Sequence, residues 1–121
     1  MKVLALLLLL TPAPAELTRH PWRMTDQPSP APEMRFTAGD PPRVSGFAGC
    51  NQFSANYELT EGGRLTFGAV VLTRMACEDT AMRREQQFLN LLRRVNGYRF
   101  DGPELLLLEN GWEAARFAAA P

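Results

Sequence analysis

Two short stretches decide the fold: Val44-Ser-Gly-Phe-Ala-Gly-Cys-Asn51 and Leu72-Thr-Arg-Met-Ala-Cys77. Each stretch carries one cysteine, and Cys50 and Cys77 are the only two in the 121-residue chain. Two lone cysteines behind an export signal are typical of a single disulfide, because oxidising compartments favour the bond. The sequence therefore predicts a Cys50–Cys77 disulfide that joins the two stretches.

The N-terminus has the anatomy of an export signal. Lys2 supplies a positive charge, residues 3–10 carry no polar side chain, and Ala13-Pro-Ala15 is a small-x-small pattern. This arrangement is typical of a cleaved secretory signal, and its apolar run is far shorter than the ~20 residues that span a bilayer. We expect a signal peptide over residues 1–15, cleavage after Ala15, and a periplasmic or secreted protein without a transmembrane span. No cysteine lies near the cleavage point, so no lipid anchor is expected.

Composition excludes one class of partner. The chain has 13 Lys or Arg, 13 Asp or Glu and a formal net charge of +0. Nucleic-acid binding usually needs a concentrated basic face, so no nucleic-acid partner is expected. The length behind the signal suffices for one modest core, and we expect a single domain and a monomer.

Residues 16–32 are rich in proline, which lacks the backbone donor that a central strand needs. We expect a mostly irregular lead-in with an edge strand near residues 22–25, and we expect Trp22 to fill the core. From Glu33 onward short polar-apolar segments alternate with turn signals. The clearest strand has Phe53, Ala55, Tyr57 and Leu59 at alternate positions.

The second half of the chain continues this pattern. Residues 61–63 and 109–111 (Glu-Gly-Gly and Glu-Asn-Gly) predict hairpins, and residues 105–108 predict a strand buried on both faces or closing a barrel. Between the two predicted hairpins, apolar residues at helical spacing predict one amphipathic helix, which Asp79 or Thr80 caps. Asn96-Gly97 should end this helix in the left-handed conformation. Short connections throughout predict an antiparallel sheet of seven to nine strands.

Parts of a catalytic site are hard to find in the sequence. His20 is the only histidine and lies in the proline-rich lead-in, where an exposed bystander is expected. A zinc site needs at least three His, Cys or carboxylate ligands, and no such spacing occurs. Glu78-Asp79 suits the dipole at the start of the helix. We expect no catalytic residue, no metal and no cofactor.

Gly46-Phe-Ala-Gly49-Cys50-Asn51 has two interpretations. One is an anion-binding nest of successive backbone amides. The other, which we favour, is a tight corner where glycine permits unusual dihedral angles and a close approach of the Cys77 segment.

The two stretches resemble the signatures of META domains, the HslJ-like heat-shock family. The first is similar to Gly-x-x-Gly-Cys-Asn and the second to Thr-x-Met-Ala-Cys, with the helix and three short strands following in the expected order. The resemblance covers residues 22–118. The matching motif residues are Gly46, Gly49, Cys50, Asn51, Thr73, Met75 and Cys77.

This resemblance implies an α+β fold: a compact, curved or barrel-like antiparallel sheet with one packed helix. It also implies a bacterial envelope protein linked to heat shock and novobiocin tolerance, without an established enzymatic activity or agreed catalytic residues. Many members are lipoproteins, whereas this chain lacks the lipidation cysteine.

The expected function is therefore a non-enzymatic, exported stress-response or accessory module that acts through its surface on an envelope protein. The alternative is a small ligand-binding or inhibitor module that uses the glycine-rich Cys50 corner or an open sheet face. An exposed cluster of Asn51, Tyr57 and Arg74 would favour this alternative, and burial of these side chains would count against it.

Overall fold

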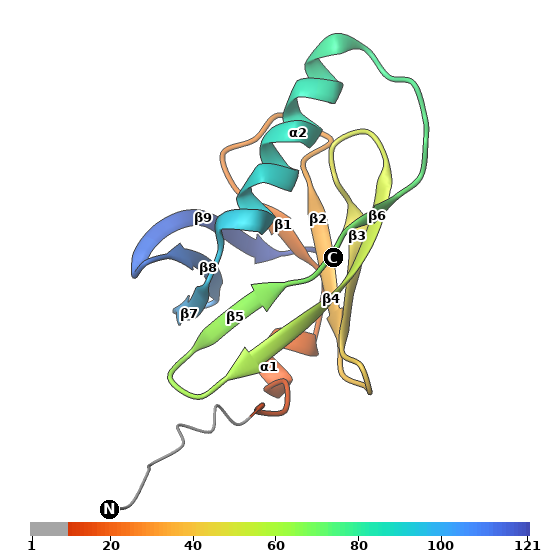
Figure 1. Cartoon of the computed structure of the whole chain (residues 1–121). Helices are drawn as coiled ribbons and strands as arrows, with labels where there is room; N and C mark the ends of the chain where they lie inside the picture. The colour runs from red at the N-terminus through yellow and green to blue at the C-terminus, as the bar shows by residue number, and fades with distance from the viewer. Residues whose placement is uncertain (1–9) are drawn as a thin grey trace, which may run out of the picture.

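Nine strands within residues 10–121, the part of the chain that the computed structural model describes, form one antiparallel sheet (Figure 1). The positive charge and most of the apolar run of the predicted signal peptide lie in residues 1–9, outside the described residues. The strands are β1 Trp22–Met24, β2 Glu33–Thr37, β3 Arg43–Phe47, β4 Gln52–Thr60, β5 Arg64–Phe67, β6 Val71–Leu72, β7 Gly97–Asp101, β8 Glu104–Glu109 and β9 Trp112–Ala119. The helices are α1 Ala15–Thr18 and α2 Asp79–Arg94.

The sheet is curved but open. Its strand order is β5-β4-β3-β2-β1-β9-β8-β7, and β6 pairs with β4 beyond the end of β5. The two edge strands meet at one end, where the amide of Tyr98 donates to the carbonyl of Gly63 at 3.0 Å. They form no ladder, because β5 has four residues and the chain then turns away toward β6. The predicted α+β fold is confirmed, and of the two predicted forms of the sheet, curved or barrel-like, the structure has the curved one, which does not close.

β1 lies in the middle of the sheet, so the predicted edge position is wrong. Trp22 pairs with Met34 of β2 on one side and with Ala119 of β9 on the other. The prolines do not prevent this pairing because they flank the three-residue strand. Trp22 is 2% exposed, as its expected place in the core requires, and its indole N–H donates to the carbonyl of Leu17 at 3.0 Å. Leu17 belongs to α1, so the lead-in is less irregular than predicted.

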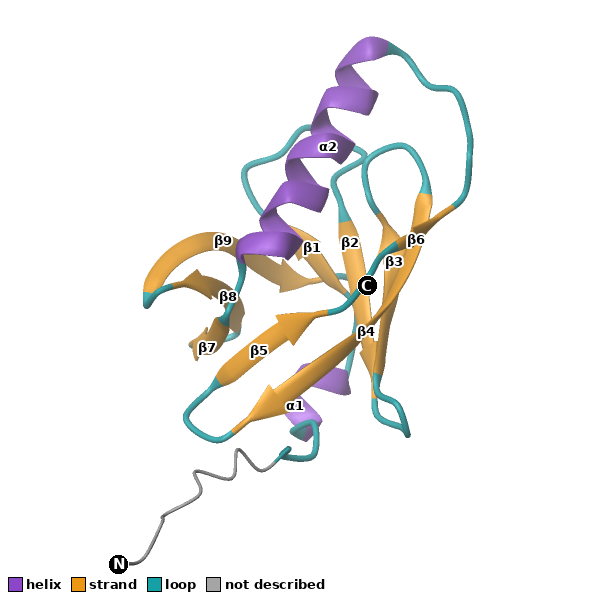
Figure 2. Cartoon of the chain, viewed as in Figure 1, coloured by secondary structure: helices purple, strands orange, loops and turns teal. Residues whose placement is uncertain are grey.

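β4 confirms the predicted alternation. Phe53, Ala55, Tyr57 and Leu59 all face the core, and the intervening side chains are exposed or half-buried. β4 pairs with β3 along one edge and with β6 and then β5 along the other. These strands form the half of the sheet on the right of Figure 2. The apolar period thus fixes both the register and the inner face of this half of the sheet.

β8 and β9 form the predicted second hairpin. Its turn has Asn110 at φ 51° and Gly111 at φ 86°, the left-handed conformations that a two-residue hairpin requires. Leu105, Leu106 and Leu107 have no exposed surface, which confirms burial on both faces of β8. Leu106 pairs across the ladders with Arg99 and Arg116, whose methylene stems can cover it.

α2 lies between the two halves of the curved sheet (Figure 1), and its apolar side packs into the core. The ring of Phe88 meets that of Phe53 edge to face, with the ring centroids 5.3 Å apart. The predicted caps are wrong at both ends. Glu78 precedes the helix without a side-chain cap bond, so Asp79 and Thr80 already lie in its first turn. At the other end Val95 is extended, and its amide closes the last turn on the carbonyl of Leu91 at 3.1 Å.

Candidate functional site

The glycine-rich corner joins β3 to β4 and faces α2. Gly49 has φ 129°, and a Cβ built on it would lie 2.8 Å from the backbone nitrogen of Glu85. A Cβ on Gly46 would collide with the carbonyl of Glu33 in the neighbouring strand. Both glycines are therefore required by close backbone approach, but the segments that approach them are α2 and β2, not the Cys77 segment that the corner interpretation predicts.

The corner is also an anion nest, and its occupant is the carboxylate of Glu85 in α2. Oε1 of Glu85 accepts hydrogen bonds from the backbone amides of Cys50 at 3.2 Å and Asn51 at 2.5 Å. Oε2 accepts a third from the side-chain Nδ2 of Asn51 at 2.9 Å. Glu85 is 6% exposed, and these three donors offset the cost of burying its charge. The two interpretations of the glycine-rich stretch thus describe the same structure.

Asn51 extends this network to the second motif. Its Oδ1 accepts hydrogen bonds from the hydroxyl of Thr73 at 3.1 Å and from the backbone amide of Met75 at 2.6 Å. The hydroxyl of Thr73 in turn accepts one from the amide of Gln52 at 3.1 Å. The disulfide between Cys50 and Cys77, with its Cα atoms 6.0 Å apart, is confirmed. Gly49, Cys50 and Asn51 of the first motif therefore meet Thr73, Met75 and Cys77 of the second beside α2, whereas Gly46 packs against Glu33 of β2.

The predicted ligand residues do not form one surface. Asn51 is 5% exposed and lies inside the network just described, and Tyr57 is 1% exposed. The hydroxyl of Tyr57 donates to the carbonyl of Thr37 at 3.1 Å, and burial raises the pKa of this phenol above its ordinary value. Arg74 alone is exposed. Burial of two of the three side chains counts against a cluster of these residues as a binding site.

Glu85 is the site residue that sequence reasoning missed. It lies three and four positions from Phe88 and Leu89, which are buried on the same helix, so it falls on the apolar face. A single carboxylate on the apolar face of a predicted helix is the signal that points to a buried acceptor. Its partners could not be read from the sequence, because 34 and 35 positions separate it from Asn51 and Cys50.

The chain between β5 and α2, residues 68–78, is an extended arm at the margin of the molecule, to the right in Figure 2. The disulfide and the Asn51 network tie its C-terminal half to the corner. An open cavity of about 640 Å³ lies beside it. The cavity is lined by Asn51, Val70, Leu72, Thr73, Arg74, Met75, Ala76 and Met82.

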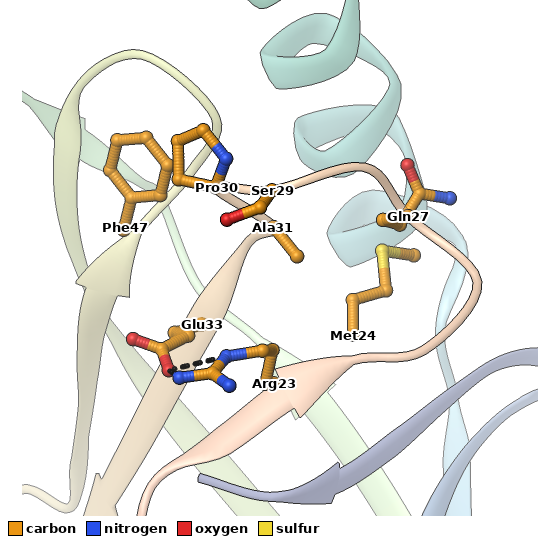
Figure 3. A pocket seen from close by; sticks show the side chains of 8 residues that line it. All are labelled: Arg23, Met24, Gln27, Ser29, Pro30, Ala31, Glu33 and Phe47. Atoms are coloured by element: carbon orange, nitrogen blue, oxygen red, sulfur yellow. Dashed lines mark hydrogen bonds and ion pairs between the residues drawn. The ribbon is translucent and has the colours of Figure 1, made fainter. Parts of the chain in front are cut away.

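A second cavity, of about 550 Å³, lies between the loop after β1 and the strands β2 and β3 (Figure 3). An ion pair between Arg23 and Glu33, with 2.9 Å between Nη2 and Oε1, lines one side of it. Apolar side chains, including Phe47 and Met24, line other parts of it. Phe47 of the first stretch lines this cavity, but none of Glu85, Asn51, Thr73 and the two cysteines does, so the cavity is separate from the hydrogen-bond network at the corner.

Among residues 10–121, no group of three or more His, Cys, Asp or Glu side chains is arranged to hold a metal ion. None of the helices in that range is long and apolar enough to cross a membrane. His20 packs against Trp22, with the ring centroids 4.4 Å apart.

Comparisons with known proteins agree with this fold. An NMR structure of a protein from Burkholderia xenovorans is 24% identical, with a TM-score of 0.68, over 88% of this chain and 86% of that chain. A second NMR structure is 21% identical, with a TM-score of 0.64, over 88% of this chain and 94% of that chain. No curated protein matches the sequence. The META domain family model matches residues 15–121, and the chain therefore belongs to the META domain family.

Proposed function

We propose that this chain is an exported, non-catalytic envelope protein that acts through its surface as a stress-response or accessory module. The main support for this proposal is that residues of both motifs hold parts of the fold together. Glu85, Asn51 and Thr73 bond to one another or to the backbone around them, and Cys50 is oxidised with Cys77. These side chains hold the corner, the arm and α2 together, which leaves function to the outside of the molecule.

The disulfide supports export. A bond of this kind persists in oxidising compartments and is rare in the cytosol. The family match begins at residue 15, where the predicted signal peptide ends. Cleavage after Ala15 would remove one residue of α1 and would keep Leu17, which has no exposed surface and packs in the core. A mature chain cut there retains every strand of the described sheet.

Export is tested by expressing the full chain, tagged at its C-terminus, in a Gram-negative host and releasing the periplasm by osmotic shock. We expect a mature form that begins at Glu16 and whose cysteines react with an alkylating reagent only after reduction. The matched control is Ala13→Asp with Ala15→Asp, which removes the small-x-small pattern and should leave the uncleaved precursor in the cell. A full-length cytoplasmic protein with two free thiols would contradict the proposal.

Absence of catalysis is tested separately on the purified mature protein. We expect no turnover of envelope substrates such as peptidoglycan fragments, lipid esters and peptides. Turnover that a single carboxylate substitution abolishes would show that the protein is an enzyme. The stress role is tested by survival of a deletion strain at elevated temperature, with and without the gene restored.

The alternative function, binding a small ligand, is favoured by one observation, the cavity of about 640 Å³ beside the arm. The glycine-rich corner itself is filled by Glu85, so an anionic ligand there would have to displace a bonded carboxylate.

A further inference from the structure

Exposed apolar side chains gather on the arm and on the adjacent first turn of α2. Val71 is 66% exposed, Met75 57% and Met82 43%. Met75 and Met82 line the cavity next to the arm, and Val71 lies in the chain between two residues that line it, Val70 and Leu72. Large apolar side chains scattered singly over a surface need no explanation, whereas a group around one cavity indicates an interaction site. Methionine adds to this, because its flexible, polarisable side chain adapts to different apolar partners.

The arm also has a free sheet edge. The backbone groups of its odd-numbered residues point toward β4 and the corner. Val71 pairs with Ser54, the amide of Thr73 donates to the carbonyl of Gln52 at 3.0 Å, and that of Met75 donates to the Oδ1 of Asn51. In an extended chain the backbone groups alternate in direction, so those of Leu72 and Arg74 point away from β4. Within residues 10–121 no strand pairs with this outer edge of β6.

Such an edge is usually protected by charged side chains, proline, a bulge, a very short strand or a covering segment. Residues 70–76, Val-Val-Leu-Thr-Arg-Met-Ala, contain no proline and a single charged side chain, that of Arg74. They are also anchored on their inner side by the disulfide and by the Asn51 network, so the edge is held in an extended form before any partner arrives. Preorganisation of this kind lowers the entropic cost of binding.

Charge narrows the choice of partner. Arg74 is exposed and takes part in none of the ion pairs formed among residues 10–121. A cation within an apolar patch favours a partner with a carboxylate opposite it. A helix could cover the patch but could not bond to the outward backbone groups, because its own are already paired. An extended strand satisfies the backbone, the patch and the cation together.

We propose that the arm binds an extended segment of a partner protein by strand addition to the outer edge of β6. Apolar side chains of that segment contact Val71, Met75 and Met82, and an acidic side chain pairs with Arg74. This inference rests on the proposed surface-mediated function and names the surface and the chemistry of the partner.

The test is selection of random nine-residue peptides, displayed on phage, against the oxidised mature protein. We expect enriched peptides to alternate apolar residues with polar ones and to carry an acidic residue at a fixed position. The protein variant Arg74→Glu should bind them about tenfold more weakly, the loss of one favourable charge contact. Arg35→Glu, an exposed arginine in β2, is the matched control and should bind as the parent does.

Two further readouts locate the bound peptide. Backbone amide shifts in the NMR spectrum should move most at Leu72 and Arg74. A proline at an alternate position of an enriched peptide should abolish binding, because it removes a backbone donor.

Four outcomes would overturn the inference. The first three are no enrichment above that on a Val71→Asp, Arg74→Glu double variant, peptides of helical periodicity, and amide shifts confined to another surface. The fourth is concentration-dependent association of the protein through the same amides, since the occupant would then be a second copy. Each of these results is independent of whether the protein is exported and non-catalytic, so failure here is distinguishable from failure of the proposed function.

Discussion

Glu85 in α2 and Asn51, the residue before β4, share two hydrogen bonds: Oε1 of Glu85 accepts from the backbone amide of Asn51 at 2.5 Å, and Oε2 accepts from its side-chain Nδ2 at 2.9 Å. The remaining polar atom of the Asn51 side chain, Oδ1, accepts from the hydroxyl of Thr73 and the amide of Met75. One helix carboxylate is thus connected through one asparagine to both motifs. This connection explains why asparagine and threonine accompany the cysteines in the two stretches.

The first prediction concerns Glu85. Replacing it with alanine leaves two backbone amides and one side-chain amide without their acceptor in a buried place. Unsatisfied buried donors cost roughly 1–3 kcal/mol each, so Glu85→Ala should lower the free energy of unfolding by roughly 3 kcal/mol or more. Glu85→Gln keeps one acceptor oxygen and should cost less. Urea unfolding monitored by tryptophan fluorescence measures both.

Gln87→Ala is the matched control, because Gln87 is exposed on the same helix. It should change the free energy of unfolding by no more than about 0.5 kcal/mol. Equal stabilities for Glu85→Ala and Gln87→Ala would show that the corner does not depend on the carboxylate.

The second prediction concerns the disulfide. Cys50 and Cys77 are 27 positions apart, and closing a loop of this length should stabilise the fold by roughly 3–4 kcal/mol in the chain-entropy description. Reduction should therefore lower the melting temperature strongly. The Asn51 network still ties the arm to the corner, so the reduced protein should remain folded at room temperature.

Differential scanning calorimetry with and without a phosphine reductant makes the measurement, and a Cys50→Ser, Cys77→Ser double variant removes any effect of the reagent itself. An unchanged melting temperature on reduction would refute the prediction.

The sequence was sufficient for the elements whose information is local. The alternation of Phe53, Ala55, Tyr57 and Leu59 placed β4, and the left-handed Asn110 and Gly111 placed the last turn. These features need only neighbours along the chain. The predicted N-cap of α2 is wrong because Glu78, Asp79 and Thr80 are all polar. The path of the arm, which the local sequence does not specify, decides which of them precedes the helix.

The candidate site was predicted only in part, since its bonds join distant segments. The disulfide could be predicted because the chain has only two cysteines. Glu85 could be recognised only as a carboxylate on the apolar face of a helix. The inner place of β1 was also hidden. Its neighbours, β2 and β9, lie about 10 and 95 positions away along the chain. The three residues of β1 are too few to specify two partners that are distant in sequence.

The third prediction concerns Gly49. An alanine there would have to adopt φ 129°, which side-chain-bearing residues rarely adopt, and its Cβ would lie 2.8 Å from the backbone of α2. Strain and overpacking together should cost roughly 3 kcal/mol or more. Gly62→Ala is the matched control, because Gly62 also has positive φ, at 81°, but no atom within 4 Å of the added Cβ.

Urea unfolding again provides the comparison, and the Gly62→Ala cost should be roughly 1 kcal/mol. A Gly49→Ala variant as stable as Gly62→Ala would show that α2 can move away from the corner without loss.

The fourth prediction concerns pH and Tyr57. Burial raises the pKa of this phenol above its ordinary value of 10.0, with a smaller contribution from Tyr98. The folded state therefore holds the Tyr57 proton more tightly than the unfolded state does. The stability that this contributes is complete below pH 10 and is lost as the pH rises through the folded-state value. We expect the free energy of unfolding to fall with pH above that point.

Tyrosinate absorbance, followed as the pH is raised, measures the titration directly, and the assignment is simple because the chain has 2 tyrosines. Tyr57→Phe removes one of them and should flatten the alkaline loss of stability. The variant should also lose about 1 kcal/mol near neutral pH, because the hydroxyl no longer donates to the carbonyl of Thr37. Tyr98, whose pKa burial and Glu16 also raise, provides the internal reference in that variant. A Tyr57 that ionises at its ordinary pKa while the protein stays folded would show that its ring is reached by solvent.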